Sequence, residues 1–152
     1  METLAMRSTL TDLMCEDGVK EQLRVQIDAA KASGEPLPHI LIHGLPGLGK
    51  TTLARAIARE MGLALVQFIG KELNHREQLA VLTKVPPQGA ILFIDEIHSV
   101  RKEVAELLYT IMEYGTMCDP TDPLLELKLF PVTVIATTTE VGSLEPPLLS
   151  RF

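Results

Sequence analysis

The chain has 152 residues and a net charge of −6, and a length of this size fits one domain. Hydrophobic residues make up 46% and charged residues 22%, an ordinary globular composition that excludes a disordered or low-complexity chain. The acidic balance argues against a protein that grips a phosphate backbone with its whole surface. An aromatic content of 4% without tryptophan argues against a stacking platform for single-stranded nucleic acid.

Signals for membrane insertion or export are absent from the sequence. No apolar run approaches the roughly 18 residues of a transmembrane helix, and residues 1–10 lack the charged-then-apolar pattern of a signal peptide. Cys15 and Cys118 are the only cysteines and form no ligand cluster in the sequence. We therefore expect a cytoplasmic protein with two buried, reduced thiols.

Strand and helix patterns alternate along the chain, which predicts an α/β domain with a largely parallel sheet. Residues 1–16 look irregular and polar, and apolar residues at helical spacing then predict a helix from Val19 to Ala30, with Gly34 as its stop. The next predicted elements are a short buried strand over 39–43, a helix over 50–61, a strand over 63–68, a weaker helix over 75–83, a buried strand over 90–94, a helix over 104–112 and a buried strand over 132–136.

Two stretches near the end of the chain are less regular. Residues 115–130 form an excursion with Pro120 and Pro123 at its turn, which we expect to be a hairpin. The chain stops at Arg151 and Phe152, where we expect a helix to begin.

The strongest chemical signal is the run Gly-Leu-Pro-Gly-Leu-Gly-Lys-Thr at 44–51, a Walker A phosphate loop. Its glycines let the backbone curl so that successive N–H groups point at phosphate oxygens, and the following helix adds its positive end. The Lys50 ammonium can reach the β and γ phosphates, and the Thr51 hydroxyl can bind Mg²⁺. Since Pro46 has no N–H, the predicted nucleotide-binding residues are Gly47, Leu48, Gly49, Lys50, Thr51 and Thr52.

The second signal is a strand of five apolar residues, 90–94, that ends in two carboxylates, Asp95 and Glu96. The carboxyl edge of a parallel sheet is where ligands bind in open α/β folds. We expect Asp95 to hold Mg²⁺, directly or through water. We expect Glu96 to act as a general base or to position the attacking water.

Two further residues are weaker candidates from the residues alone. A buried strand ends in three threonines at 137–139, and a hydroxyl there could face the γ-phosphate or the catalytic water, although threonine is also an ordinary strand residue. Arg151 lies on a loop beyond that strand and could reach the γ-phosphate of a neighbouring subunit, although a lone arginine is usually solvated.

Together these motifs resemble those of the AAA+ ATPases, and within them the RuvB family of Holliday-junction branch-migration motors. The likeness runs through nearly the whole chain from about Thr9, and its similar stretches are 19–25, 47–53, 57–62, 92–98 and 148–152. The resemblance implies that residues 1–152 form an AAA+ large nucleotide-binding subdomain. It also implies a P-loop NTPase parallel sheet flanked by helices, with the lid and winged-helix domains absent.

The resemblance further implies an ATPase of the helicase type that couples ATP turnover to DNA branch migration, with ATP or ADP and Mg²⁺ as its ligands. It places sensor 1 at Thr139 and a trans-acting arginine finger at Arg151, which are catalytic roles beside those of Lys50 and Glu96. A finger in trans implies a ring of copies of the chain, expected to be hexameric. Contacts with DNA would come through parts not in this chain, and the short segment 115–130 argues against a RuvA-like partner.

The chain also departs from the family pattern. Cys15-Glu16 stands where the family has Gly-Gln, Glu140 where it commonly has arginine, and Leu149 at a further basic position. Without a lid, the chain is a fragment or a shortened relative. These departures keep a second function open, a P-loop switch that binds nucleotide with little turnover. A small nucleotide kinase is disfavoured because no arginine-rich cluster follows the Walker A loop.

Overall fold

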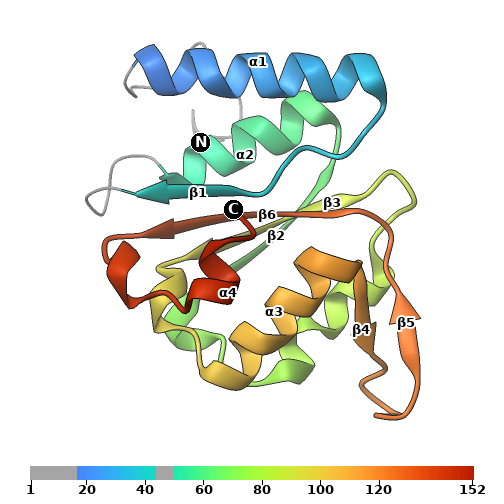
Figure 1. The fold of residues 1–152 in the computed structure, drawn as a ribbon. Coiled ribbons are helices and arrows are strands. Elements are labelled where there is room, and N and C mark those ends of the chain that lie inside the picture. Colours follow the sequence, from blue (N-terminus) through green and yellow to red (C-terminus); the bar gives the residue numbers. More distant parts are fainter. Residues whose placement is uncertain (1–16, 44–49) are drawn as a thin grey trace, which may run out of the picture.

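The computed structural model describes residues 17–43 and 50–152, which form a four-stranded sheet with helices on both faces (Figure 1). All three strand pairs of this sheet are parallel, which confirms the predicted α/β class. In spatial order the strands are β1 (Ile40–His43), β6 (Val132–Thr138), β3 (Ala90–Asp95) and β2 (Ala64–Ile69).

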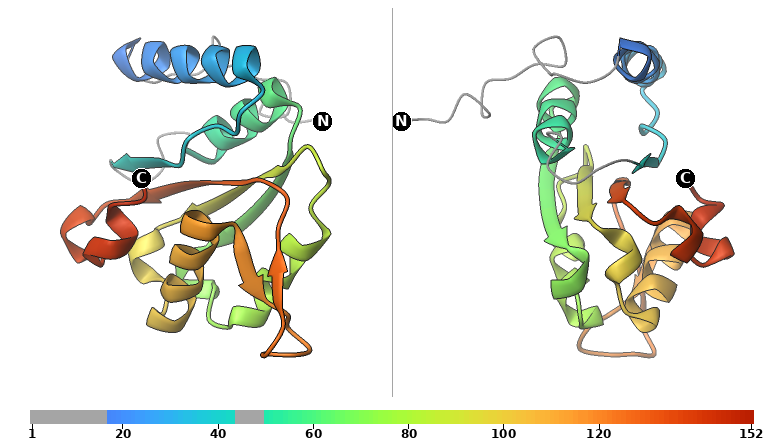
Figure 2. Two further views of the ribbon diagram at one scale, coloured as in Figure 1. Left: turned by 45° about the vertical axis from the view of Figure 1, so that its right-hand side comes forward. Right: turned by 90° about the vertical axis from the view of Figure 1, so that its left-hand side faces the viewer.

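The helices divide between the two faces of the sheet (Figure 2). One face carries α1 (Asp17–Ser33) and α2 (Lys50–Met61). The opposite face carries α3 (Lys102–Tyr114), α4 (Pro146–Leu149), the 3₁₀ helix Arg76–Lys84 and an antiparallel hairpin of β4 (Thr116–Cys118) and β5 (Glu126–Lys128). Three further 3₁₀ turns span Gly70–Glu72, Ile97–Ser99 and Val141–Ser143.

The alternation of side chains along β3 builds two cores from one strand. Ile91 and Phe93 pack with the buried faces of α1 and α2. Leu92 and Ile94 pack on the other side with α3 and the Arg76–Lys84 segment. Because β3 is buried on both faces, its continuous apolar run is what a central parallel strand requires.

The first two helices are joined by an ion pair as well as by apolar contacts. Ile27 is fully buried between them and the sheet. Both Nη atoms of Arg24 donate to the Glu60 carboxylate, at 2.6 and 3.1 Å. Glycines at positive φ end the two helices, Gly34 at 72° and Gly62 at 67°, in agreement with the predicted stops.

Four local expectations are corrected by the structure. The strand β1 is half-buried rather than buried, because it lies at an edge of the sheet. The predicted weak helix at 75–83 is a 3₁₀ helix, whose three-residue repeat matches the spacing of its buried residues Leu79 and Leu82. Cys118 is exposed, because alternation along β4 gives the buried position to Met117. A short helix, Pro146–Leu149, precedes Arg151, with proline in its first turn.

Other expectations agree with the structure or lie beyond it. The excursion at 115–130 forms the predicted hairpin. The irregular stretch 1–16, Cys15 and the loop 44–49 lie outside the described residues. Within the described part of the chain, no helix has the length and apolar character to cross a membrane.

His39 precedes β1 and joins this edge of the sheet to the neighbouring strand β6 and to α3. Its Nδ1 accepts a hydrogen bond from the Val134 N–H at 2.9 Å, and its Nε2 lies 3.4 Å from the Met112 carbonyl oxygen. Burial lowers the pKa of His39, and the contact with Met112 opposes this effect only in part. The fold therefore holds the neutral imidazole, whose Nδ1 must stay unprotonated to accept from Val134.

We predict that His39 makes the protein sensitive to mild acid. Above the unfolded-state pKa of about 6.5, the imidazole of His39 is neutral in both the folded and the unfolded chain, and its contribution to the free energy of unfolding is fully present. As the pH falls below it, the unfolded chain binds the proton first, so the free energy of unfolding decreases until the folded-state pKa is passed. Urea unfolding of wild type and His39→Asn between pH 8 and pH 5 measures this, since asparagine can accept from Val134 without titrating. Equal pH slopes for the two proteins would contradict the prediction.

Candidate functional site

The ends of the parallel strands bring the predicted site residues to one edge of the sheet. Asp95 is the last residue of β3, and Thr138 is the last of β6. The register pairs Ile94 with Ala136, so the residues that follow these two positions lie side by side. At the same edge β1 ends opposite Thr138, and α2 begins at Lys50 after the glycine-rich loop.

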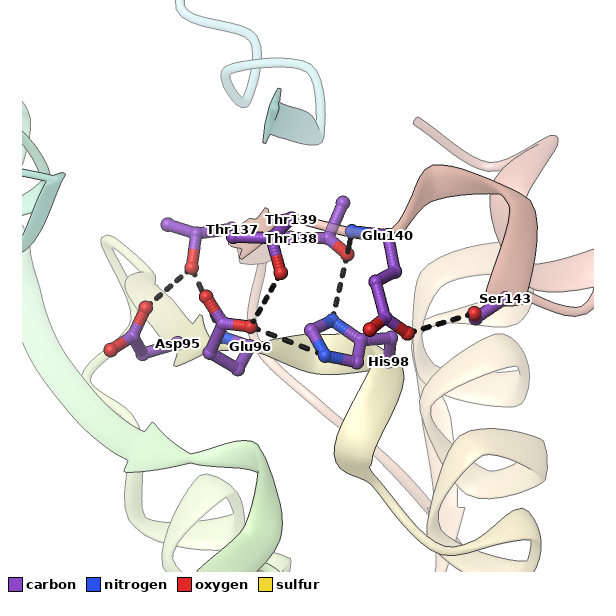
Figure 3. Close-up of polar contacts among 8 residues, drawn as sticks. All are labelled: Asp95, Glu96, His98, Thr137, Thr138, Thr139, Glu140 and Ser143. Atoms are coloured by element: carbon purple, nitrogen blue, oxygen red, sulfur yellow. Dashed lines mark hydrogen bonds and ion pairs between the residues drawn. The ribbon is translucent and has the colours of Figure 1, made fainter. Parts of the chain in front are cut away.

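Asp95 and Thr137 are joined across the two central strands (Figure 3). The Thr137 hydroxyl donates to Asp95 Oδ1 at 2.5 Å and accepts from the Glu96 N–H at 3.0 Å. Thr137 itself is fully buried, while Asp95 and Glu96 are partly exposed. A charge-assisted bond of this kind restrains the carboxylate more firmly than a neutral hydrogen bond does.

Glu96 holds an unusual backbone conformation. Its φ is 56° and its ψ is 57°, and it is the one non-glycine residue with positive φ in the described part of the chain. Such a conformation costs about 1–3 kcal/mol and persists only where the surroundings enforce it. Gly70 leaves room for this turn, because a β-carbon there would collide with the Glu96 carbonyl oxygen and lie 2.9 Å from its carbonyl carbon.

The Glu96 carboxylate is held by two side chains on one of its oxygens. The Thr139 hydroxyl donates to Oε2 at 3.2 Å, and His98 Nε2 lies 3.2 Å from the same atom. Among the described residues no donor contacts Oε1, and the side chain is 26% exposed. The second oxygen is therefore available to accept a hydrogen bond from water.

The contacts of His98 define its tautomer. An ionised carboxylate only accepts, so Nε2 must carry a proton to bond Glu96. In the neutral ring Nδ1 is then the acceptor, and the Thr138 hydroxyl, 2.8 Å away, donates to it. The Thr138 oxygen in turn accepts from the Glu140 N–H at 2.9 Å, and the Glu140 carboxylate accepts from Ser143 at 3.0 Å (Figure 3). A continuous chain of hydrogen bonds thus runs from the loop after β6 to Glu96.

Sequence reasoning therefore identified part of this cluster and missed the rest. The structure places Asp95 and Glu96 at the carboxyl end of β3, as expected from their strand, and brings Thr139, the residue that the family resemblance singles out, to Glu96. The roles of Thr137 and Thr138 were missed, although alternation along a strand ending in three threonines offers hydroxyls to both sides. Nothing in the sequence pointed to Gly70, whose role depends on the approach of two separate turns.

The predicted phosphate-binding residues fall into two groups. Gly47, Leu48 and Gly49 lie outside the described residues. The first turn of α2 consists of Lys50, Thr51 and Thr52. This turn contains no acidic residue. A helix start of this length and composition presents free N–H groups and a positive dipole end to an anion.

The oxygen donors near this edge suit a hard cation. A carboxylate from Asp95 and a hydroxyl from Thr51 are ligands that Mg²⁺ uses, completed by phosphate oxygens and water rather than by a protein cage. Residues 17–43 and 50–152 hold no cluster of three or more His, Cys, Asp or Glu side chains placed to bind a metal ion. Thr137 donates to Oδ1 of Asp95, and no donor among the described residues contacts its Oδ2 atom.

Arg151 takes up contacts with its own chain. It forms an ion pair with Glu113 and lies over the ring of Tyr109, with its guanidinium carbon 5.1 Å from the ring centre. Both partners belong to α3. Among the described residues, no hydrogen bond or ion pair joins Arg151 to the Asp95–Glu96 cluster, so the structure does not bring it into the site of its own chain.

A comparison with known protein families shows to which family the chain belongs. Residues 6–152 match the family described as the Holliday junction DNA helicase RuvB P-loop domain. The chain belongs to this RuvB family. Its parallel sheet flanked by helices is accordingly a P-loop NTPase fold, and nucleotide binding is the property that this family implies.

Solved structures agree with this assignment. The Thermotoga maritima RuvB Holliday junction branch migration motor is 37% identical, with a TM-score of 0.82 over 97% of this chain and 47% of that chain. A mutant of the same RuvB is 38% identical, with a TM-score of 0.84 over 95% of this chain and 46% of that chain. The chain thus spans just under half the length of these RuvB structures.

We predict that Gly70→Ala destabilises the protein through Glu96. The new β-carbon forces the Glu96 carbonyl or the Gly70 turn to shift, which costs about 1–3 kcal/mol of unfolding free energy. Gly142→Ala is the matched control, because a β-carbon there has nothing within 4 Å, and it should change stability by about 0.5 kcal/mol or less. Urea unfolding of both variants measures the difference, and equal stabilities would show that the close approach at Gly70 is unimportant.

Proposed function

We propose that the chain is the ATP-hydrolysing large subdomain of a RuvB-like AAA+ motor, in which ATP turnover is coupled to branch migration of Holliday junctions. The observation that carries the proposal is the position of the Glu96 carboxylate. Two donors hold Oε2, and no donor among the described residues contacts Oε1, at a partly exposed edge beside the candidate metal ligand Asp95. A protein that binds nucleotide without hydrolysing it does not require a carboxylate held in this way.

Each of the proposed site residues has a separate task. The main-chain N–H groups of the loop, together with the Lys50 ammonium, bind phosphate oxygens. Thr51 and Asp95 hold Mg²⁺, which when bound neutralises charge on the β and γ phosphates. The proposed nucleotide-binding set is Gly47, Leu48, Gly49, Lys50, Thr51 and Thr52.

Glu96 orients the attacking water in this proposal. Its Oε1 accepts a proton or a hydrogen bond from the water, while the bonds from Thr139 and His98 prevent the carboxylate from rotating. Thr139 acts as the sensor, because its hydroxyl contacts Glu96 directly and lies at the end of the strand beside β3. Arg151 is assigned to the site of a neighbouring copy, in a ring that we expect to be hexameric.

A nucleotide-binding switch with little turnover is the second candidate. It is favoured by Glu140, an acidic residue where arginine is common in the family, whose N–H bonds the Thr138 hydroxyl next to the catalytic cluster. It is also favoured by the ion pair of Arg151 with Glu113, which occupies the proposed finger within its own chain. DNA is assigned to parts outside this chain, and no partner is proposed for the hairpin.

Two substitutions separate binding from turnover. Lys50→Ala removes a charge that faces phosphate, so we expect nucleotide affinity to fall about 10- to 100-fold, in line with about 1.5–3 kcal/mol for a charged hydrogen bond. Glu96→Gln keeps the shape of the side chain and loses the base, so we expect affinity to persist while turnover falls about 10²- to 10⁴-fold. Calorimetry with ATP and a phosphate-release assay give the two quantities.

The outcomes distinguish the two candidate functions. Unchanged affinity in Lys50→Ala would refute nucleotide binding at this loop. Undiminished turnover in Glu96→Gln would refute the role of that carboxylate. Tight binding by the wild type without measurable turnover at any protein concentration would favour the switch.

The finger assignment predicts complementation between two inactive variants. In a mixture of Lys50→Ala and Arg151→Ala, an interface can pair an intact loop from one copy with an intact arginine from the other. Because an arginine finger contributes about 10³–10⁵ in rate, the mixture should hydrolyse ATP faster than either variant alone wherever sedimentation shows assembly. Glu113→Gln is the structural control, since it removes the ion pair and keeps the arginine.

The result depends on assembly, which sedimentation reports independently. If the chain assembles while wild type and Arg151→Ala hydrolyse ATP equally fast, the finger assignment is wrong. We expect the isolated chain to be mainly monomeric and slow. In that case the mixture shows no rescue, and wild-type turnover per molecule does not rise with protein concentration.

A further inference from the structure

Thr137 is a fully buried hydroxyl with two directed hydrogen bonds and no assigned task. It follows Ala136, which pairs with Ile94, so it lies beside Asp95 across the junction of β6 and β3. Its oxygen is 2.5 Å from Asp95 Oδ1 and 3.0 Å from the Glu96 nitrogen. One atom thus contacts both members of the acidic pair (Figure 3).

The direction of each bond follows from the chemistry of the three groups. The Glu96 N–H can only donate, so the Thr137 oxygen accepts it. The hydroxyl proton is then free to point at Asp95, whose carboxylate only accepts. Both bonds are made at once, and neither requires a water molecule. Exchanging the hydroxyl for a methyl group leaves a buried N–H without its partner and a carboxylate without its restraint.

We propose that Thr137 is a positioning residue for the metal-bound nucleotide. Its hydroxyl turns Asp95 so that Oδ2 faces the cation, and it anchors the left-handed turn at Glu96 from the main-chain side. The proposal rests on the proposed function, because it assigns Asp95 to Mg²⁺. Outer partners of this kind typically contribute 10- to 100-fold to metal affinity.

Thr133 provides a matched control on the same strand. It lies four residues earlier on the same face of β6, is 2% exposed, and donates its hydroxyl proton to the Leu37 carbonyl oxygen at 2.8 Å. Replacing either threonine by valine removes one buried hydroxyl and keeps the branched shape. Both variants remove a buried hydroxyl from β6, but Thr133→Val loses one hydrogen bond to a carbonyl oxygen, whereas Thr137→Val loses the two bonds to the acidic pair.

The test measures how much Mg²⁺ strengthens nucleotide binding. Calorimetry gives the affinity for a non-hydrolysable ATP analogue in EDTA and in excess Mg²⁺, and the ratio of the two isolates the metal contribution. We expect this ratio to fall about 10-fold or more in Thr137→Val, with the EDTA affinity unchanged. Thr137→Ser should restore the ratio, because it returns the hydroxyl. Thr133→Val should keep the wild-type ratio, and thermal unfolding records the stability of each variant.

Every outcome bears on the proposal. An unchanged ratio in Thr137→Val, or an equal loss in Thr133→Val, overturns it while nucleotide binding stands. If Thr137→Val does not fold, the smaller Thr137→Ala is compared with Thr137→Ser in the same way. A wild-type chain that binds the analogue with no effect of Mg²⁺ overturns the assignment of Asp95 and the inference with it. A wild-type chain that binds no analogue under either condition overturns the proposed function itself.

Discussion

The parallel pairing of β3 with β6 is the constraint on which the rest of the molecule depends. Both strands are buried on both faces, so their apolar runs fix the two helical layers through one alternation of side chains. Their register, with Ile94 opposite Ala136, also decides which residues meet where the strands end. The main-chain pairing that joins the two central strands therefore also places the acidic pair beside the three threonines. A slip by one residue would turn the polar ends toward opposite faces.

The left-handed turn at Glu96 shows how that edge differs from an ordinary strand end. A carboxylate that continued along β3 would alternate with Asp95 and point to the opposite face of the sheet. The turn redirects the carboxylate instead, and the hydrogen bond from the Glu96 N–H to Thr137 offsets part of its cost, while the lack of a side chain at Gly70 avoids a clash with the turn. Strain of this kind is stored where geometry matters more than stability. The surrounding threonines and His98 then limit the carboxylate to one orientation.

The sequence predicts the central strands and the placement of Asp95 and Glu96, because these depend on local pattern and on the shared carboxyl edge of a parallel sheet. Pattern alone points only to a hydroxyl within 137–139, and the choice of Thr139 comes from the family resemblance. It does not predict that β1 is half-buried, since an apolar run is the same at the edge as in the middle. Nor does it distinguish the 3₁₀ helix Arg76–Lys84 from an α-helix, because few buried positions define its period. Thr137 and Gly70 escape prediction for a stronger reason. Their roles exist only after separate segments approach each other.

The position of Arg151 links the proposed chemistry to assembly through an exchange of partners. Its guanidinium now contacts Glu113 and Tyr109, both on α3. To act on a neighbouring copy, Arg151 would have to exchange these contacts for contacts with phosphate. The free energy of its interaction with phosphate across the interface must then exceed that of its contacts with α3. Both side chains of the ion pair are about one-third exposed, which keeps that cost small. A phosphate bound in a water-poor interface interacts with arginine far more strongly than an exposed carboxylate does. In the proposed ring, the exchange would be favourable only when a nucleotide-loaded neighbour is present, and ATP turnover would then be coupled to the state of the adjacent subunit.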